Sequence, residues 1–407
     1  MTRSVLISGG GIAGPSLAYW LGRSGYAVTV VEQAPALRSS GGSPVDFRGD
    51  QMDLLARMGI DDEIKAHQTG MGDQIVVDRT GRRVSTLPSA LLSGEVEIER
   101  SDLARILYDR SKGVAEYRFD DAVTALAETP DGVEVAFARS PARRFDLVVG
   151  TDGPHSGVRR LAFGEETFFR HDLGLYVAGF RIPNDFGIVH GGVVYNEPGK
   201  FVMVNSGRDT TTALVTMIFA SADRDDHRHS VEDQKRLIAG HFTGAGWRVP
   251  ALLAALQDTP DLYFDSISQI RLARWSTGRI ALVGDSAWCP GPGGSATGLA
   301  MLGAYTLAGE LALAADNHVE AYQRYERVMR EKAATSQRTA AWTVGTFLTP
   351  GTERGIRIRN ALMRVASTRP LIAAFEWSSR RGGARTGTLT GYPLAGTHQP
   401  LPAPHAR

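Results

Sequence analysis

The hydrophobic pattern at the start of the chain predicts a strand, a helix and a second strand in succession. Residues 4–8 form a short apolar run that is typical of a buried parallel strand. Residues 12–24 carry apolar side chains at helical spacing, with Pro15 in the first turn, where its missing N–H is harmless. Residues 27–32 are apolar again and end at Glu32. This order indicates a βαβ unit and therefore a parallel sheet.

Two later apolar runs have the character of further buried strands. Residues 144–150 lead into Asp152-Gly153, and residues 279–284 lead into Asp285. A long apolar helix is predicted from about residue 299, but Gly and Glu residues interrupt it, so it is too broken to span a bilayer comfortably. The chain is therefore expected to return twice to one parallel sheet.

The segments between these runs alternate between apolar and polar positions, as the strands of an antiparallel sheet do. Strand alternation should turn about half of the aromatic side chains here toward a substrate cavity and the others away from it. Two helices are expected within this region, and residues 316–380 read as mostly helical. The predicted strands are 73–78, 83–87, 95–99, 175–182, 192–195, 201–205 and 212–220, the helices are near 231–242 and 250–257, and the aromatic candidates are Tyr176, Phe180, Tyr195, Phe201 and Phe219.

Composition limits the setting of the protein. The 407 residues are 43% hydrophobic and 22% charged, with a net charge of +1, so neither a nucleic-acid nor a membrane partner is expected. The single cysteine, Cys289, excludes an intrachain disulfide and a multi-cysteine zinc site. We expect it to be a small packing residue. The first residues resemble a strand rather than a secretory signal, so a cytoplasmic location is expected.

The loop after the first strand is rich in glycine. Its sequence is Gly9-Gly10-Gly11-Ile12-Ala13-Gly14. Gly9 allows a tight turn, Gly11 lets the backbone approach a pyrophosphate, and Gly14 lets the helix pack on the strand. A helix begins at Ile12 and Ala13, and the free N–H groups and dipole at its N-terminus favour the binding of a phosphate group. Glu32 can accept hydrogen bonds from ribose hydroxyls, and its charge disfavours a 2′-phosphate, so FAD or NAD is expected here.

A second candidate site follows the strand at 279–284. Asp285 stands at the carboxyl end of a parallel strand, where open α/β sheets bind ligands. Its carboxylate could hold the ribityl hydroxyls of a flavin. The following loop, 286–298, contains Gly294 and lets the backbone pass close to a flat ring. The dipole of the next helix would stabilise the negative charge of a reduced flavin.

Together these motifs resemble the class A flavin monooxygenases, the para-hydroxybenzoate hydroxylase-like group, over about residues 1–330. The resemblance is carried by Gly9-x-Gly11-x-x-Gly14, Glu32, Arg100, Asp152-Gly153-x-His155-Ser156-x-x-Arg159 and Gly284-Asp285. Two positions depart from that family, which often has a histidine where this chain has Trp288 and a different glycine loop at 292–296.

The resemblance assigns further residues to the cofactor. It places Arg100 on the flavin side, Asp285 at the ribityl–pyrophosphate region, and Asp152 at a motif linked to both FAD and NAD(P)H. Asp46 lies in a segment similar to one that passes close to the flavin in tetracycline-modifying relatives. The cofactor-binding set is thus Gly9, Gly11, Ile12, Ala13, Gly14, Glu32, Asp46, Arg100, Asp152, Asp285 and Gly294.

The expected fold class is α/β, with a Rossmann-like FAD-binding domain, an inserted antiparallel-sheet substrate domain and a helical C-terminal segment. The FAD-binding domain is expected to be discontinuous, because the apolar strands that form it are separated by the alternating segments. The expected boundaries are 1–69, 100–168 and 275–330 for the FAD-binding domain, 70–99 and 169–274 for the substrate domain, 331–380 for the C-terminal helices and 381–407 for a surface tail.

The resemblance implies an FAD-dependent monooxygenase that uses NAD(P)H and O₂. A flavin hydroperoxide would deliver one oxygen atom to an aromatic or polyketide-like small molecule, inside a cavity that excludes water. No catalytic side chain and no metal site can be assigned from the sequence. Three alternatives stay open, namely an FAD-dependent halogenase, a flavin dehydrogenase, and a flavoprotein that sequesters a ligand without turnover.

Overall fold

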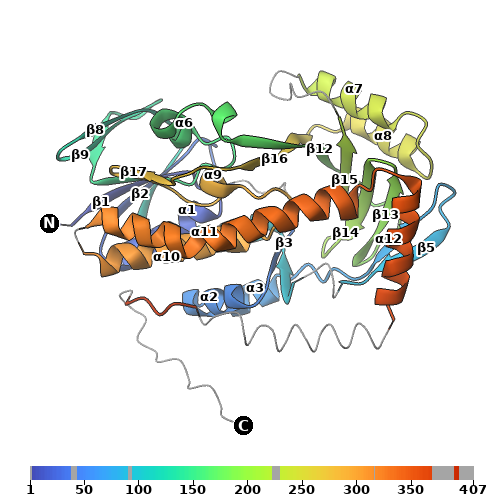
Figure 1. The fold of residues 1–407 in the computed structure, drawn as a ribbon, viewed down its shortest axis with the longest axis horizontal. Coiled ribbons are helices and arrows are strands. Elements are labelled where there is room, and N and C mark those ends of the chain that lie inside the picture. Colours follow the sequence, from blue (N-terminus) through green and yellow to red (C-terminus); the bar gives the residue numbers. More distant parts are fainter. Residues whose placement is uncertain are drawn as a thin grey trace, which may run out of the picture.

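The computed structural model describes residues 2–37, 44–89, 94–221, 230–315, 317–368 and 389–393. Figure 1 shows two lobes and a long helix that runs across both of them, α11 (His318–Trp342). One lobe contains the N-terminal strands, and the other contains a large sheet covered by helices. The chain crosses between the lobes several times, so each lobe is built from separated segments.

The first lobe contains a six-stranded sheet in which all neighbouring pairs are parallel except the β17–β18 pair at one edge. Its central strands are apolar and almost completely buried, because α1 (Ala13–Arg23) and α10 (Ala296–Leu313) pack against each other beside them. The strands, in spatial order, are β17 (Ser276–Thr277), β18 (Ile280–Leu282), β11 (Leu147–Gly150), β1 (Ser4–Ser8), β2 (Ala27–Glu32) and β7 (Ala115–Phe119).

Smaller elements surround this sheet. A three-stranded sheet is formed by β10 (Arg143–Phe145), β9 (Gly132–Phe137) and β8 (Val123–Thr129). The strand β6 (Val96–Ile98) pairs with β3 (Val45–Phe47) and not with the large sheet of the second lobe, although the strand before it in sequence, β5 (Arg83–Leu87), belongs to that sheet. The helices of this lobe include α2 (Asp50–Met58), α3 (Asp61–Ala66), α5 (Arg100–Ser111), α6 (Gly157–Phe163) and α9 (Asp285–Trp288).

The second lobe is a seven-stranded sheet that is antiparallel apart from the β4–β13 pair. One face is covered by α7 (Val231–Phe242) and α8 (Val249–Asp258), and part of the other is covered by the helical segment 343–348 and α12 (Glu353–Ala366). The strands, in order, are β16 (Tyr263–Ile270), β12 (Arg170–Pro183), β15 (Thr212–Ala220), β14 (Lys200–Ser206), β13 (Gly191–Glu197), β4 (Gln74–Val77) and β5 (Arg83–Leu87).

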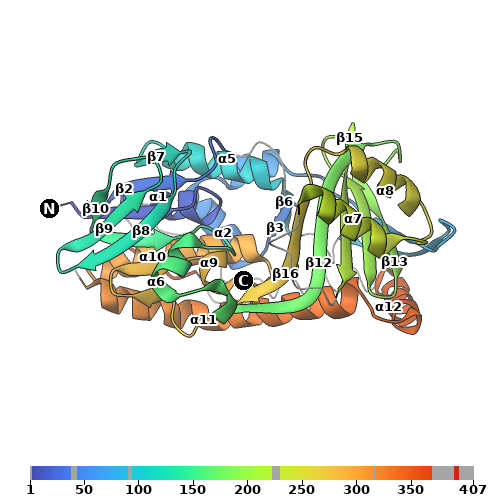
Figure 2. The same cartoon turned by 90° about the horizontal axis from the view of Figure 1, so that it is seen from above.

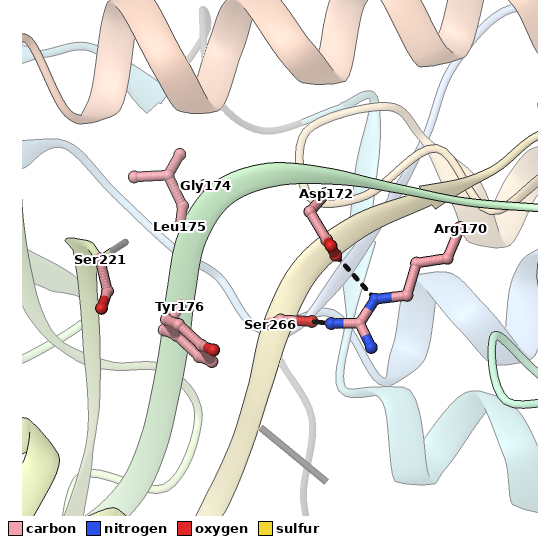
Figure 3. Close-up of a pocket in the computed structure, with 7 residues that line it drawn as sticks. All are labelled: Arg170, Asp172, Gly174, Leu175, Tyr176, Ser221 and Ser266. Carbon is pink, nitrogen blue, oxygen red and sulfur yellow. Dashed lines mark hydrogen bonds and ion pairs between the residues drawn. The ribbon is translucent and has the colours of Figure 1, made fainter. Parts of the chain in front are cut away.

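The strands β12 and β16 connect the two lobes. They lie side by side in antiparallel register and extend from the first lobe into the large sheet (Figure 2). The pairing shifts between Asp172 and Leu175, where Gly174 adopts a positive φ of 72°. Figure 3 shows this bend and the small hollow beside it, where the Arg170 guanidinium joins Asp172 (2.7 Å) to Ser266 of β16 (2.6 Å). These contacts brace the connection between the lobes.

One described helix, α10, is long and apolar enough to cross a membrane by composition alone. Its apolar window is 78% buried within the protein, as in the core helix of a compact domain. α10 packs against α11, and its Gly309 lies against Tyr392 of the segment 389–393. The hydrophobicity of this helix is therefore explained by internal packing.

The predicted fold class is confirmed by the parallel sheet, the inserted second sheet and the helices that follow. The described helices of 316–380 end at Ala366, and residues 369–388 lie outside the described residues. Most of the expected tail at 381–407 also lies outside them, but residues 389–393 within it are described and pack on α10. Elements that the sequence pattern did not predict include β7–β9, α2, α3, α6 and β16.

Candidate cofactor and substrate site

The glycine loop between β1 and α1 forms a close-packed turn. Gly9 has a φ of 110°, and a Cβ there would lie 2.6 Å from the Thr151 carbonyl oxygen. A Cβ at Gly14 would collide with the Gly9 carbonyl oxygen. Gly11 differs, because no heavy atom of the described residues lies within 4 Å of the position of its Cβ. The loop is therefore tight on its protein side and open at Gly11, as an approach to a phosphate requires.

Glu32 is positioned by this same loop. Its Oε2 accepts a hydrogen bond from the Gly10 N–H at 2.7 Å, and its Oε1 accepts one from the Ala34 N–H at 2.9 Å. A carboxylate offers about four acceptor sites, so lone pairs remain for a diol. Ile12 and Ala13 begin α1 directly behind the loop and are buried. This arrangement fits the adenosine end of a dinucleotide.

The second motif meets the first one in space. A Cβ at Gly284 would lie 3.4 Å from the Ala13 Cβ and 3.2 Å from the Ala300 Cβ of α10. Gly284 adopts a φ of 75° and starts α9, which places Asp285 in the first turn of that helix. Segments separated by about 270 residues in sequence are thus joined at one place through the close packing of small residues.

Asp285 is a titratable residue whose ionisation is perturbed by its surroundings. Burial raises the pKa of its carboxyl group, and the Arg100 guanidinium opposes that rise. Among the described residues, none donates a hydrogen bond to this side chain. Arg100, at the start of α5, is exposed. A desolvated carboxylate needs hydrogen-bond donors, and the hydroxyls of a ribityl chain would supply them. Asp285 and Arg100 therefore fit the FAD that the sequence implies.

Asp152 is occupied by its own chain. Its carboxylate accepts hydrogen bonds from the Ser156 hydroxyl and from the Val158 N–H (3.0 Å), which caps α6. Burial raises the pKa of Asp152, and these hydrogen bonds and Arg159 oppose the rise. The backbone of Asp152 also lies against Gly9. The structure therefore gives this residue a role in shaping the loop, and direct contact with a cofactor stays a prediction.

Asp46 and Gly294 are each in contact with other parts of the chain. Asp46 of β3 accepts a hydrogen bond from Arg48 Nε at 2.8 Å. Gly294 packs against α11, where a Cβ would lie 2.8 Å from the Ser336 hydroxyl oxygen. Close approach of α11 thus explains the glycine at this position, and its predicted contact with a flavin stays a prediction.

Two residues that follow Asp285 pack in the hydrophobic core. Trp288 and Cys289 are both buried, and burial raises the pKa of the Cys289 thiol well above its usual value. Trp288 packs on Trp275 with ring centroids 4.5 Å apart, and a Cβ at Gly303 would contact its ring. Both are therefore core residues, as expected for Cys289.

The aromatic side chains of the large sheet face mainly toward α7 and α8. Tyr176, Phe180, Tyr195 and Phe219 belong to the hydrophobic cluster beneath α7 and α8. Only Phe201 of the five candidates lies on the other face. Fewer than half of the five aromatic side chains therefore point to the face that was expected to line a cavity, because the other four point to the face covered by α7 and α8.

Tyr263 and Asp265 lie on β16, the edge strand of the large sheet, which the sequence pattern did not predict. Asp265 is 3.4 Å from His155 Nε2, and His155 Nδ1 is 3.0 Å from Glu166. This cluster joins the loop after Asp152 to the second lobe. The signal in the sequence was the alternation Tyr263-x-Asp265-x-Ile267, which places polar groups and an apolar anchor on one face.

Comparison with known proteins agrees with this geometry. The family model described as "FAD binding domain" matches residues 2–338. A flavin-dependent monooxygenase from an unknown prokaryotic organism is 35% identical over 352 residues, covering 85% of this chain and 91% of that protein. An uncharacterized protein of Mycobacterium tuberculosis is 40% identical over 331 residues, covering 79% and 88%.

A solved structure is similar over nearly the whole chain. The crystal structure of the tetracycline destructase Tet(55) has a TM-score of 0.82 and 31% identity, and the alignment covers 96% of this chain and 99% of that one. The similarity therefore includes both lobes and is not limited to the dinucleotide motif.

Proposed function

The chain belongs to the FAD-binding-domain family of class A flavin-dependent monooxygenases, and from that premise we propose that it uses NAD(P)H and O₂ to oxygenate an aromatic or polyketide-like small molecule. The observation that carries the proposal is the meeting of the open glycine loop with the desolvated Asp285. The name of Tet(55) supports the substrate class, because tetracycline is an aromatic polyketide scaffold. The proposed location is the cytoplasm.

In this proposal different residues bind different parts of FAD. Gly9, Gly11 and Gly14 admit the pyrophosphate to the N-terminus of α1, and Glu32 accepts the adenosine ribose hydroxyls. Asp285 accepts the ribityl hydroxyls, and Arg100 faces the flavin end. FAD, when bound and reduced by NAD(P)H, would supply the activation of O₂.

The protein's remaining task is to position the substrate and exclude water. The face of the large sheet opposite α7 and α8 is apolar in part, with Val194, Phe201 and Ile218 in one cluster beneath Val344. A cavity next to this face would shelter the reaction from solvent. The helix dipole of α10 would stabilise negative charge on a reduced flavin near its N-terminus.

The test is an assay in which the purified holoenzyme is supplied with NADH or NADPH, and O₂ uptake and substrate oxidation are measured together. We expect flavin absorbance in the wild type, and nucleotide oxidation that is accelerated by an aromatic polyketide such as tetracycline, with an added oxygen atom in the product. Asp285→Ala should bind FAD at least tenfold more weakly. A protein that takes up no FAD, or that oxidises NAD(P)H without ever oxygenating an aromatic compound, would contradict the proposal.

A further inference from the structure

Side chains of α11 and β16 hold the loop 288–295 by its backbone carbonyl groups. Gln337 of α11 donates from Nε2 to the Trp288 carbonyl oxygen at 3.2 Å. Gln269 of β16 is fully buried and donates from Nε2 to the Pro290 carbonyl oxygen at 2.9 Å. The negative ends of these peptide groups are therefore turned toward α11 and β16.

Ser336 of α11 holds a further carbonyl group of the same loop. The buried Ser336 hydroxyl donates to the Gly294 carbonyl oxygen. A Cβ at Gly294 would lie 2.9 Å from the Pro290 Cβ, so the backbone is enclosed at this point. In a planar trans peptide group the N–H points opposite to the C=O. The N–H of Ser295, which belongs to the same peptide group, therefore points away from Ser336.

Ser295 has a backbone conformation that serine rarely adopts. Its φ is 51° and its ψ is 38°, in the left-handed region. Serine is a favourable N-cap when its side chain accepts a hydrogen bond from the first turn, but here it accepts none, although α10 begins at the next residue. The left-handed conformation costs a serine about as much as one hydrogen bond contributes. The hydrogen bond from Ser336 can therefore decide which orientation this peptide group takes.

The N–H groups at the start of α10 have no acceptors within the described protein. None of the described residues accepts a hydrogen bond from the N–H groups of residues 294–297. The first N–H groups of a helix carry a partial positive charge, and α10 is 18 residues long. In the proposed function, these groups stabilise the negative charge of reduced FAD, because their dipoles are already oriented toward it.

We infer that Ser336 is a positioning residue that raises the reduction potential of bound FAD by fixing the orientation of the Gly294–Ser295 peptide group. The inference rests on the proposed function and deepens it, because it names a residue of α11 that regulates the cofactor through the loop. Without the Ser336 hydroxyl, the peptide group can rotate and relieve the strain at Ser295. The Gly294 carbonyl oxygen would then replace the N–H, and an acceptor at this place disfavours the negatively charged, reduced cofactor.

The experiment measures the reduction potential of FAD in the holoenzyme, by anaerobic equilibration with a redox dye of known potential. Ser336→Ala should lower the ratio of reduced to oxidised FAD at least tenfold at a given potential, which corresponds to about 30 mV for a two-electron couple. Damage to the fold alone weakens the binding of oxidised and reduced FAD alike, so it leaves the potential unchanged.

The matched control is Thr335→Ala. Thr335 is the neighbouring residue on the exposed side of α11, and its hydroxyl accepts a hydrogen bond from Arg338 at 3.0 Å. This variant removes a hydroxyl from the same turn of the helix without touching the loop, so it should keep the wild-type potential.

A pair of variants at position 295 tests the same peptide group independently of α11. Ser295 is exposed, so neither substitution disturbs the core. Ser295→Asn should keep the wild-type potential, because asparagine tolerates the left-handed region. Ser295→Val, with a β-branched side chain that does not tolerate this region, should lower the potential as Ser336→Ala does.

A wild-type potential in Ser336→Ala, or equal potentials in Ser295→Asn and Ser295→Val, would overturn the inference. A wild type that takes up no FAD overturns both this inference and the proposed function. A wild type that binds FAD and gives the expected shifts, but oxygenates no compound, overturns the proposed function alone.

Discussion

At the scale of single residues, the same chemical group serves different purposes according to its hydrogen bonds. Burial raises the pKa of both Asp152 and Asp285. Asp152 finds its donors in Ser156 and Val158 and closes the end of a helix. Asp285 has the Arg100 charge but no donor among the described residues, so it is the one poised for a ligand. The sequence predicts both residues as cofactor-binding candidates, and only their hydrogen-bond partners in the structure distinguish their roles.

The charge of His155 gives a prediction about pH. Its folded pKa of about 10 lies above the ordinary value of 6.5, so folding favours the protonated form. The stabilisation is complete below about pH 6.5 and is lost as pH rises through about 10. We expect the difference in Tm between wild type and His155→Gln to be largest near pH 6 and to shrink toward pH 10. Because the side chain is 42% exposed, the effect should stay within about 1 kcal/mol.

The measurement is thermal unfolding followed by circular dichroism at a series of pH values. His67→Gln serves as the control, because His67 contacts the Glu63 carbonyl oxygen and Arg105 instead of two carboxylates. That variant should show no such trend. A difference for His155→Gln that is constant between pH 6 and 10 would exclude the charged imidazole.

At the scale of elements, two glycines of one loop are required for different reasons. Gly14 is needed for the packing of α1 on the loop, because a Cβ would overlap the Gly9 carbonyl oxygen. Gly11 meets no protein atom of the described residues, so its requirement comes from outside the chain. The GxGxxG pattern predicts both roles, and the tertiary contacts distinguish them.

We therefore expect Gly11→Ala and Gly14→Ala to fail in different ways. Gly11→Ala should leave the apoprotein as stable as the wild type and weaken FAD binding at least tenfold, since its methyl group enters the phosphate approach. Gly14→Ala should destabilise the protein with and without FAD, by about 1–3 kcal/mol. Apoprotein Tm and FAD titration by fluorescence give the two quantities. Unchanged FAD affinity in Gly11→Ala would refute the assignment of the loop.

At the scale of the whole molecule, distant segments complete the first lobe. Tyr392, only 5% exposed, lies on α10, where its hydroxyl donates to Glu310 Oε1 at 2.8 Å. Its ring packs on Tyr305 with centroids 5.2 Å apart and occupies the space that a Cβ at Gly309 would take. Arg57 of α2 donates to the Leu389 carbonyl oxygen at 3.0 Å. Part of the predicted tail is thus a component of the core.

Substitution of Tyr392 should therefore act on stability. Tyr392→Ala should cost about 3–5 kcal/mol, as for other large buried aromatic residues. Tyr392→Phe should cost about 1–3 kcal/mol, because the buried Glu310 carboxylate loses its donor. Denaturant unfolding of the two variants measures both values. If Tyr392→Ala unfolds at the same denaturant concentration as the wild type, this segment contributes nothing to the core.

The sequence by itself determined the family, the fold class and most of the cofactor-binding candidates, because these depend on local patterns. A strand, a glycine turn and a helix each follow from a few neighbouring residues, and the order of the motifs identified the class A flavin monooxygenases. What only the tertiary structure decided was pairing between distant residues. The contact of Gly284 with Ala13, the Tyr263–Asp265–His155 chain and the burial of Tyr392 each join segments far apart in the chain. No local pattern encodes such contacts, because they arise only when the packed lobes bring those segments together.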